Sequence, residues 1–230
     1  MTEGGEEHMP GFKSEREMFD AMQEKLYASV VSDILDQLGA RDQVMRADVA
    51  PVYDGAILVG RAYPVLSADI FEIRDDPYRA EIEAVDSLKP NDVIVVSTNR
   101  SIRTCFWGEL LSTAARARGA RGAIIDGYTR DVAQIRRMKF PTFATGRRLV
   151  DSAGRSIVID HGCPISCGDV VVRPGDIVFG DIDGVAVIPK ELEKEVIPLA
   201  LEKVGKENVV RDELLKGTML GDVYARHKVL

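Results

Sequence analysis

Two short apolar runs separated by a helical pattern constrain this chain more than any other feature. Residues 93–96 and 123–125 are continuous apolar runs of the kind found in buried strands. The segment between them, from Trp107 to Arg118, has the pattern of a helix that ends at Gly119. A strand–helix–strand connection of this length predicts two neighbouring parallel strands joined in the right-handed sense. The chain is therefore expected to have an α/β fold.

Further helices and strands are predicted on both sides of this unit. Ser14, followed three residues later by Glu17, is a capping box that predicts a helix start, and a second apolar stripe ends at Gly39. Asp76 and Pro77 are expected to open another helix, carrying Ile82, Val85 and Leu88. The other predictions are strands at residues 56–59, 62–66, 156–159, 170–172, 177–179 and 185–188, with Gly60 at a bulge or a close backbone contact, and a helical segment from residue 190 that breaks near Pro198.

The hydrophobic periodicity along the chain predicts one domain after an N-terminal tail. Residues 1–13 lack hydrophobic periodicity and are expected to form a flexible N-terminal tail. Residues 14–230 are expected to form a single domain with helices at its N-terminal side and a C-terminal helical extension. With 230 residues and 45% hydrophobic content, the chain is long enough to bury a core of its own.

The net charge and the cysteine content limit the classes of partner and the cellular location that we expect for this protein. Lys and Arg number 30 against 37 Asp and Glu, and the resulting net charge of −7 disfavours nucleic acid and anionic membranes as partners. The apolar runs are far shorter than the roughly 20 residues of a membrane span, and the N-terminus shows no secretory signal. Cys105, Cys163 and Cys167 form no disulfide framework. We therefore expect a cytoplasmic protein that acts on a small molecule.

Two segments near the predicted strand–helix–strand unit carry groups suited to catalysis. The helix start at Gly108–Leu111 offers unpaired N–H groups for an anion, and residues 126–131 follow the carboxyl end of a buried strand, where open α/β sheets bind ligands. Arg130 offers a planar fork for a carboxylate, and Asp131 and Glu109 offer oxygen ligands for Mg²⁺ or Mn²⁺. The alternative is that Arg130 and Asp131 form a loop ion pair and that Glu109 only favours the first helical turn.

An ordered set of motifs resembles the RraA-like superfamily, which includes the 4-hydroxy-4-methyl-2-oxoglutarate aldolases. The resemblance covers most of residues 26–190 and implies a layered β/β/α sandwich with extra helices at both termini, assembled as a homotrimer or a hexamer. The motifs are Asn91-Asp92-Val93, Trp107-Gly108-Glu109-Leu110-Leu111, Ala114 to Gly119, Arg130-Asp131, Pro164 to Gly168 and Arg173 to Asp176.

The resemblance also assigns roles to residues. It implies that Arg130 binds the carboxylate of the pyruvyl unit, that Asp131 ligates a divalent metal, and that the amides of Gly108 to Leu111 assist. Glu109 stands where the aldolases have Asp, which keeps a carboxylate that is one methylene longer. In the aldolases a C-terminal acid of the neighbouring subunit completes the site, and Glu207 is the candidate here.

The leading hypothesis is a metal-dependent lyase that cleaves a 4-hydroxy-2-oxo acid to pyruvate through a metal-stabilised enolate, with oxaloacetate decarboxylation as a related activity. One alternative is a non-catalytic protein like the ribonuclease regulators of the superfamily, although Gln134 stands where those proteins favour an acid. Another alternative is a metal-dependent enzyme for a different hydroxy acid or sugar acid.

Other reactive residue types are assigned structural roles. His161, Cys163 and Cys167 lack a fourth ligand at zinc spacing, and Cys105 lacks a histidine partner. Lys89 and Lys139 are the nearest candidates for a Schiff base, but neither is expected to be buried. The helix that ends at Gly39 carries three further polar residues near its start, for which solvent exposure is favoured over a place in the site: Ser32, Asp33 and Asp36.

Overall fold

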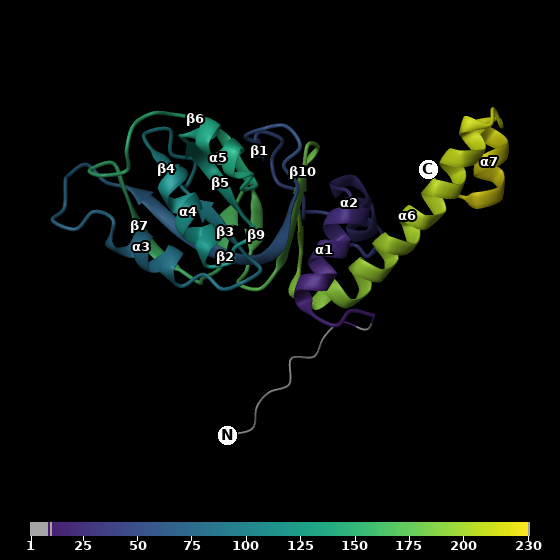
Figure 1. Cartoon of the computed structure of the whole chain (residues 1–230), viewed down its shortest axis with the longest axis horizontal. Coiled ribbons are helices and arrows are strands. Elements are labelled where there is room, and N and C mark those ends of the chain that lie inside the picture. The colour runs from purple at the N-terminus through teal and green to yellow at the C-terminus, as the bar shows by residue number, and fades with distance from the viewer. Residues whose placement is uncertain (1–8, 10, 230) are drawn as a thin grey trace, which may run out of the picture.

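The computed structural model describes residues 9 and 11–229, and it has the expected layered α/β architecture (Figure 1). The predicted strand–helix–strand unit is confirmed, because β3 (Asp92–Ser97) and β5 (Gly122–Thr129) are parallel neighbours connected through α4 (Glu109–Ala117). Both strands are apolar and buried because further layers cover both faces of the sheet.

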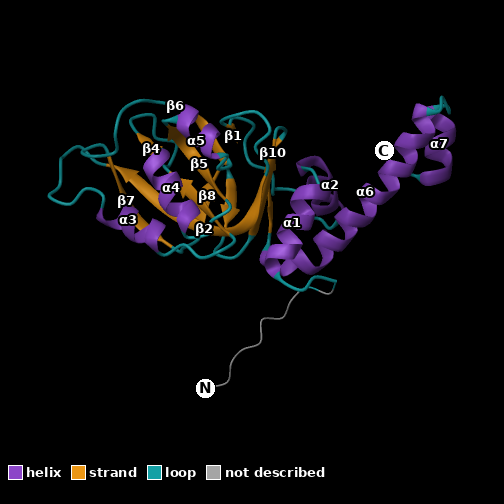
Figure 2. Cartoon of the chain, in the orientation of Figure 1, coloured by secondary structure: helices purple, strands orange, loops and turns teal. Residues whose placement is uncertain are grey.

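Short strands on either side of this unit extend it into one large sheet (Figure 2). Their bounds are β1 (Ala50–Pro51), β2 (Leu58–Asp69), β4 (Cys105–Trp107), β6 (Thr142–Arg147), β7 (Ser156–His161), β10 (Ile177–Asp181) and β11 (Gly184–Ile188). The order in the sheet is β1-β6-β5-β3-β2-β10-β11, with β4 beside β5 and β7 beside β2. The β2–β3, β3–β5 and β5–β6 pairs are parallel, and β10 is antiparallel to both β2 and β11.

Different layers cover the two faces of the large sheet. The helices α3 (Arg79–Asp86), α4 and α5 (Val132–Met138) cover one face, around Trp107 and Ile135. The antiparallel pair β8 (Ile165–Cys167) and β9 (Val170–Val172) covers the other face, around Ile124 and Phe143. The β/β/α order is therefore confirmed.

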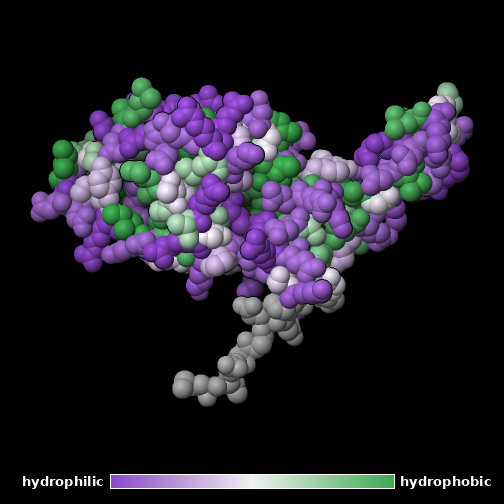
Figure 3. All heavy atoms as spheres, viewed as in Figure 1, coloured by the Kyte–Doolittle hydropathy of each residue, from purple (hydrophilic) through white to green (hydrophobic). Residues whose placement is uncertain are grey.

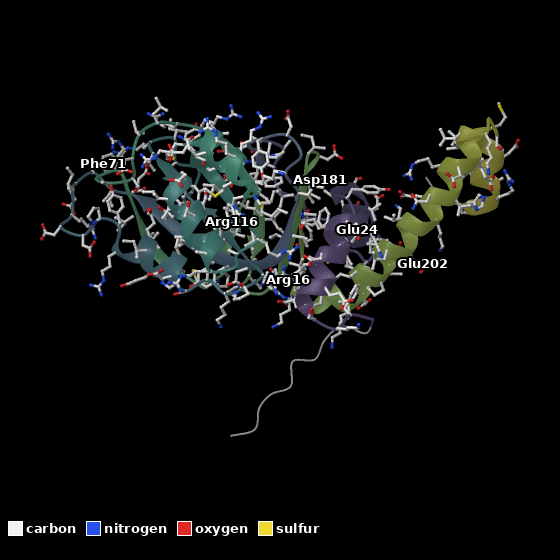
Figure 4. All side chains as sticks on the ribbon, in the orientation of Figure 1. Arg16, Glu24, Phe71, Arg116, Asp181 and Glu202 are labelled. Carbon is white, nitrogen blue, oxygen red and sulfur yellow. The ribbon has the colours of Figure 1, made fainter. Side chains whose placement is uncertain are left out.

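A helical layer packs against β10 and β11. It consists of α1 (Glu15–Lys25), α2 (Ala28–Gln37) and the first half of α6 (Glu193–Leu215), which follows the short helix η1 (Lys190–Leu192). Asp181, labelled in Figure 4, lies between the sheet and these helices and accepts the N–H of Ala28 at 2.7 Å, which satisfies the start of α2. The rest of α6 and α7 (Leu220–His227) project from the body as a C-terminal arm, residues 201–229 (Figure 1).

The local signals at the N-terminal helices are confirmed, and other expectations are corrected. The Ser14 side chain accepts the N–H of Glu17 at 3.2 Å, and α2 ends before Gly39, which has a φ of +84°. Residues 58–69 form one strand rather than two, and Gly60 marks the close backbone contact, because a Cβ there would lie 2.5 Å from the carbonyl oxygen of Asn91. The strands β1, β4, β6 and β8 and the helix α5 were not predicted.

The predicted break near Pro198 is wrong, because α6 continues through this residue. A proline in a helix removes one backbone hydrogen bond. The burial of Val196, Ile197 and Ala200 against α1 and α2 offsets that loss and holds the helix together.

Most of the predicted tail, residues 1–8 and 10, lies outside the described residues. At its described end, Met9 is only 8% exposed and Phe12 packs against the same apolar cluster, so this part of the segment is packed against the helical layer. None of the helices within residues 9 and 11–229 is long and apolar enough to cross a membrane.

Candidate functional site

The carboxyl end of β5 meets the N-terminus of α4. The N–H of Arg130 donates to the carbonyl of Trp107 at 2.9 Å, and the hydroxyl of Thr129 donates to the same oxygen at 3.0 Å. These bonds hold the residue after β5 against the residue before the N-cap Gly108. The two segments that the sequence suggested for catalysis are therefore adjacent.

Gly108 allows a carboxylate to approach the helix start. A Cβ on Gly108 would lie 2.8 Å from Oδ2 of Asp131, which is too close for any side chain at this position without movement of that carboxylate. Asp131 has a φ of +58°, an uncommon conformation for a residue with a side chain, and its Oδ2 accepts the N–H of Glu109 at 3.1 Å. The carboxylate of Asp131 thus lies at the positive end of the α4 dipole.

These residues line a cavity of about 350 Å³. One wall contains Gly108, Glu109, Leu110 and Leu111 together with Arg130 and Asp131, so every site residue predicted in this part of the chain faces the same space. The Arg130 and Asp131 side chains are 39% and 40% exposed, and Nε of Arg130 lies 3.8 Å from Oδ2 of Asp131. This loose pairing leaves the guanidinium accessible to a ligand.

The cavity is also lined by residues that the sequence did not single out as functional, namely Tyr78, Glu81, Asp151 and Ser152. Oδ1 of Asp151 lies 3.2 Å from Nη2 of Arg130, and its Oδ2 accepts a hydrogen bond from the hydroxyl of Tyr78. Burial alone would raise the pKa of Asp151, but the bonds from Tyr78 and the Ala153 N–H, with the charge of Arg130, lower it below its usual value. Asp151 is therefore anionic and orients Arg130.

Glu81 is half-buried and lies on the inward face of α3. Positions 81, 84, 85 and 88 share one helix face, and Ala84, Val85 and Leu88 are all at most 5% exposed. Burial is the main cause that raises the pKa of Glu81 to about 7, and the negative charge of Asp151 raises it further. The sequence signal for Glu81 is its position on the same helix face as the apolar Val85 and Leu88. Ile82, which was predicted to belong to that apolar face, is 52% exposed.

The donor set of the cavity suits a small hard cation. Oδ2 of Asp131 accepts from Glu109, and Oε1 of Glu109 accepts from the hydroxyl of Thr113 at 2.9 Å, so one oxygen on each carboxylate remains for a ligand. Mg²⁺ keeps several waters and commonly needs only one or two protein carboxylates. Among the described residues, no group of three or more His, Cys, Asp or Glu side chains is placed to hold a metal ion.

The remaining candidates lie elsewhere in the chain. Glu207 is in the C-terminal arm, where it accepts from the hydroxyl of Tyr27 and lies 3.9 Å from Nζ of Lys203, away from the cavity. Asp33 pairs with Lys203 at 2.6 Å. Gln134 is exposed on α5. The three cysteines are free: Cys105 borders the cavity, and burial raises the pKa of its thiol to about 12, which makes it a packed thiol rather than a nucleophile. Lys89 and Lys139 are exposed.

A second Arg–Asp cluster lies on the other face of β5. The side chain of Asp126, within this strand, is 5% exposed, and its two oxygens bind Nη2 of Arg46 at 2.6 Å and the N–H of Gly168 at 3.0 Å. Arg46 also reaches Asp48 at 3.1 Å and Asp169 at 3.2 Å. Both oxygens of Asp126 are thus already bonded within the protein.

Comparisons with known proteins agree with this architecture. A family model described as RraA-like, Aldolase/RraA, matches residues 28–187. A protein of Halalkalibacterium halodurans with the provisional name 4-hydroxy-4-methyl-2-oxoglutarate aldolase is 30% identical over 189 residues, which cover 80% of this chain and 85% of that protein. Protein DlpA of Legionella pneumophila is 28% identical over 190 residues, and the chain spans only 30% of its length.

A solved structure shows the same fold. The crystal structure of Streptomyces coelicolor RraAS2, described as an unusual member of the RNase ES inhibitor RraA protein family, superposes with a TM-score of 0.75 at 24% identity. The match covers 88% of this chain and 99% of that structure. Because the family model matches well over half of the residues, the chain belongs to the RraA-like family, Aldolase/RraA.

Proposed function

We propose that this protein is a divalent-metal-dependent lyase that cleaves a 4-hydroxy-2-oxo acid, such as 4-hydroxy-4-methyl-2-oxoglutarate, to pyruvate and a second carbonyl compound. The observation that carries the proposal is the cavity in which Arg130, Asp131 and the N-terminus of α4 face one another. The provisional aldolase name of the Halalkalibacterium relative supports the same reaction class.

Arg130 is the group that binds the substrate carboxylate in this proposal. It is the cation among the described residues that line the cavity, against the four acids Glu81, Glu109, Asp131 and Asp151. Its planar fork matches a carboxylate in two-pronged geometry, and Asp151 holds that fork in place. The first-turn N–H groups of α4 add a positive electrostatic potential beside the same carboxylate.

Asp131, with Glu109, would hold Mg²⁺ or Mn²⁺, which supplies a Lewis acid for the 2-oxo and carboxylate oxygens of the substrate. When the C3–C4 bond breaks, its electron pair remains on the pyruvate unit as an enolate. Arg130 holds the carboxylate of that unit and thus keeps the developing charge beside a cation and a helix N-terminus. Oxaloacetate decarboxylation passes through the same enolate and is proposed as a second activity.

We also propose that the protein assembles as a trimer or a hexamer. The C-terminal arm projects from the body and carries exposed apolar side chains, among them Leu215 at 80% and Met219 at 73% exposure. Figure 3 shows apolar areas on the otherwise hydrophilic arm and over the helices of the body. Light scattering tests the assembly, and an active monomer would contradict it. The role of Glu207 at a neighbouring subunit's site stays a prediction.

The proposed location is the cytoplasm. All three cysteines are free, and Cys105 and Cys167 are buried. Burial raises the pKa of both thiols, so they remain protonated. Unpaired cysteines are typical of a reducing compartment.

A substrate screen tests the proposed reaction. Chelator-treated protein is given a panel of 4-hydroxy-2-oxo acids and oxaloacetate, with and without added Mg²⁺ or Mn²⁺, and pyruvate is measured. Metal-dependent release is the expected result. A pyruvate adduct trapped by borohydride, with activity unaffected by chelator, would contradict the metal mechanism and indicate a lysine Schiff base instead.

A further inference from the structure

The cavity contains one carboxyl group that differs from the other three in its surroundings. We propose that Glu81 is the catalytic acid–base group, which takes a proton from the substrate and returns it to the product. This inference rests on the proposed lyase function and adds the proton-transfer residue that the Arg130–Asp131 wall does not supply.

The placement of Glu81 is the first support. It comes from α3 and lines the same cavity as Arg130 and Gly108 to Leu111, so a substrate held by Arg130 would share this space with the Glu81 carboxyl group. Its Oε2 accepts a hydrogen bond from the hydroxyl of Ser152 at 3.5 Å. The charged and titratable groups near it are Asp151, which precedes Ser152, Tyr78 at the start of α3, and Arg130, which pairs with Asp151.

Two of the other three carboxylates lie beside positive groups. Asp131 accepts the N–H of Glu109 beside the helix dipole, and Asp151 binds Arg130 and Tyr78. Glu109 accepts a hydrogen bond from the exposed hydroxyl of Thr113. Glu81 instead sits in line with the buried Ala84, Val85 and Leu88, where an uncharged carboxyl is tolerated. The pKa of about 7 that follows from this burial allows Glu81 to accept and donate a proton near neutral pH.

The proton balance of the cleavage needs only one such group. The carboxylate of Glu81 takes the proton of the 4-hydroxyl, the O–H electron pair forms the new C=O bond, and the C3–C4 bond breaks to give the enolate. Glu81 then returns the proton to C3, which yields pyruvate and restores the carboxylate. No oxidant, reductant or further reactant is required.

Glu81→Gln tests this role with a neutral group of the same size. We expect kcat/KM for pyruvate release to fall about 100-fold, the common size of an acid–base contribution, with an unchanged melting temperature. In the wild-type enzyme kcat/KM should rise with pH because the reaction starts from the carboxylate, and this rise should be absent in Glu81→Gln. Glu83→Gln is the matched control, because Glu83 lies on the same helix and pairs with Arg79 at the exposed surface.

Ser152→Ala gives a second measurement, the pH profile of kcat/KM. This profile would not shift if Glu81 had only a structural role. The serine hydroxyl donates to the carboxylate and lowers the pKa of Glu81, so its removal should raise that pKa and move the rising limb of the profile to higher pH. A profile that stays in place in Ser152→Ala would contradict the inference. So would wild-type kcat/KM in Glu81→Gln.

Carbon-13 NMR of the carboxyl groups in chelator-treated protein gives a measurement that is independent of activity. A resonance that titrates near pH 7 in wild type and is missing in Glu81→Gln is expected. If that resonance is present but none of the 2-oxo acid substrates yields pyruvate, the lyase function is contradicted, while the raised pKa of the Glu81 carboxyl group is confirmed. If pyruvate is released but Glu81→Gln behaves as wild type, only the role of Glu81 is overturned.

Discussion

Two Arg–Asp clusters lie near β5, one built on Asp126 within the strand and facing β8 and β9, the other on Asp131 just after the strand with its carboxylate at the start of α4, and they differ in how many of their hydrogen-bonding groups the protein itself uses. Asp126 is 5% exposed and lies 2.6 Å from Arg46, with its second oxygen on Gly168. Asp131 is 40% exposed and lies 3.8 Å from Arg130. The first cluster is saturated and holds the β8–β9 turn to the sheet, whereas the second keeps its groups available. Burial, together with the use of both carboxylate oxygens by the protein, therefore distinguishes the structural ion pair of Asp126 from the candidate site at Asp131, although the residue types are the same.

The largest expected effect is on stability. Asp126→Ala leaves the Gly168 N–H and the buried end of Arg46 without their partner, so the free energy of unfolding should fall by about 3 kcal/mol. The value lies at the low end for a buried pair because Arg46 keeps Asp48 and Asp169. Urea unfolding measures it, with Asp131→Ala as the control, for which a change below about 1 kcal/mol is expected. Equal losses in both variants would remove the distinction between the clusters.

Arg130→Lys should show the reverse pattern. The variant keeps the positive charge but loses the planar fork, so kcat/KM should fall about 100-fold while the free energy of unfolding changes by less than about 1 kcal/mol. Steady-state pyruvate assays and urea unfolding measure the two quantities. Full activity in Arg130→Lys would exclude two-pronged carboxylate binding.

A smaller effect is expected at Gly108. In Gly108→Ala the new methyl group would lie 2.8 Å from Oδ2 of Asp131 and displace that carboxylate, so Mg²⁺ affinity should fall about tenfold, equivalent to about 1.4 kcal/mol. Gly205→Ala is the control, since a Cβ on this helical glycine meets nothing within 4 Å and should leave Mg²⁺ affinity unchanged. Calorimetry compares the two variants, and unchanged affinity in Gly108→Ala would contradict the proposed place of the metal.

The smallest effect concerns the bond from Tyr78 to Asp151. This bond lowers the pKa of Asp151, so its stabilising contribution is present above the unfolded pKa near 3.8 and is lost as pH falls through the lower folded value. Tyr78→Phe should therefore reduce the free energy of unfolding by less than about 1 kcal/mol at pH 7, because solvent screens this partly exposed pair. The difference from wild type should shrink below pH 4, as urea unfolding across pH would show. A difference that stays constant with pH would rule out this linkage.

The sequence predicted the parts of the fold that depend on local pattern. Periodicity placed β3, α4 and β5, and the turn signals placed β9, β10 and β11, because the apolar residues of each element follow the period of a helix or a strand and pack into the core. The predicted helix break near Pro198 was wrong because tertiary packing of the neighbouring residues overrides the low helix propensity of one proline. The three-residue β4 was missed because its pairing with β5 depends on a contact between distant segments.

Only part of the candidate site could be predicted from the sequence. Gly108 to Leu111 and Arg130-Asp131 carry recognisable motifs, and the structure places them on one wall of the cavity. The other polar lining residues come from the start of α3 and from Asp151 and Ser152, which belong to no motif and are brought to the cavity only by folding. The burial that raises the pKa of Glu81 is likewise a property of the packed structure.

The central claim is that the cavity at Arg130 and Asp131 is the metal-binding active site, and calorimetric Mg²⁺ titration of two matched variants tests it most directly. Asp131→Asn and Asp151→Asn each remove one negative charge from the same cavity. If Asp131 is the ligand, Mg²⁺ affinity should fall at least about tenfold in Asp131→Asn and by no more than about threefold in Asp151→Asn. Equal affinities in Asp131→Asn and the wild-type protein would contradict the claim.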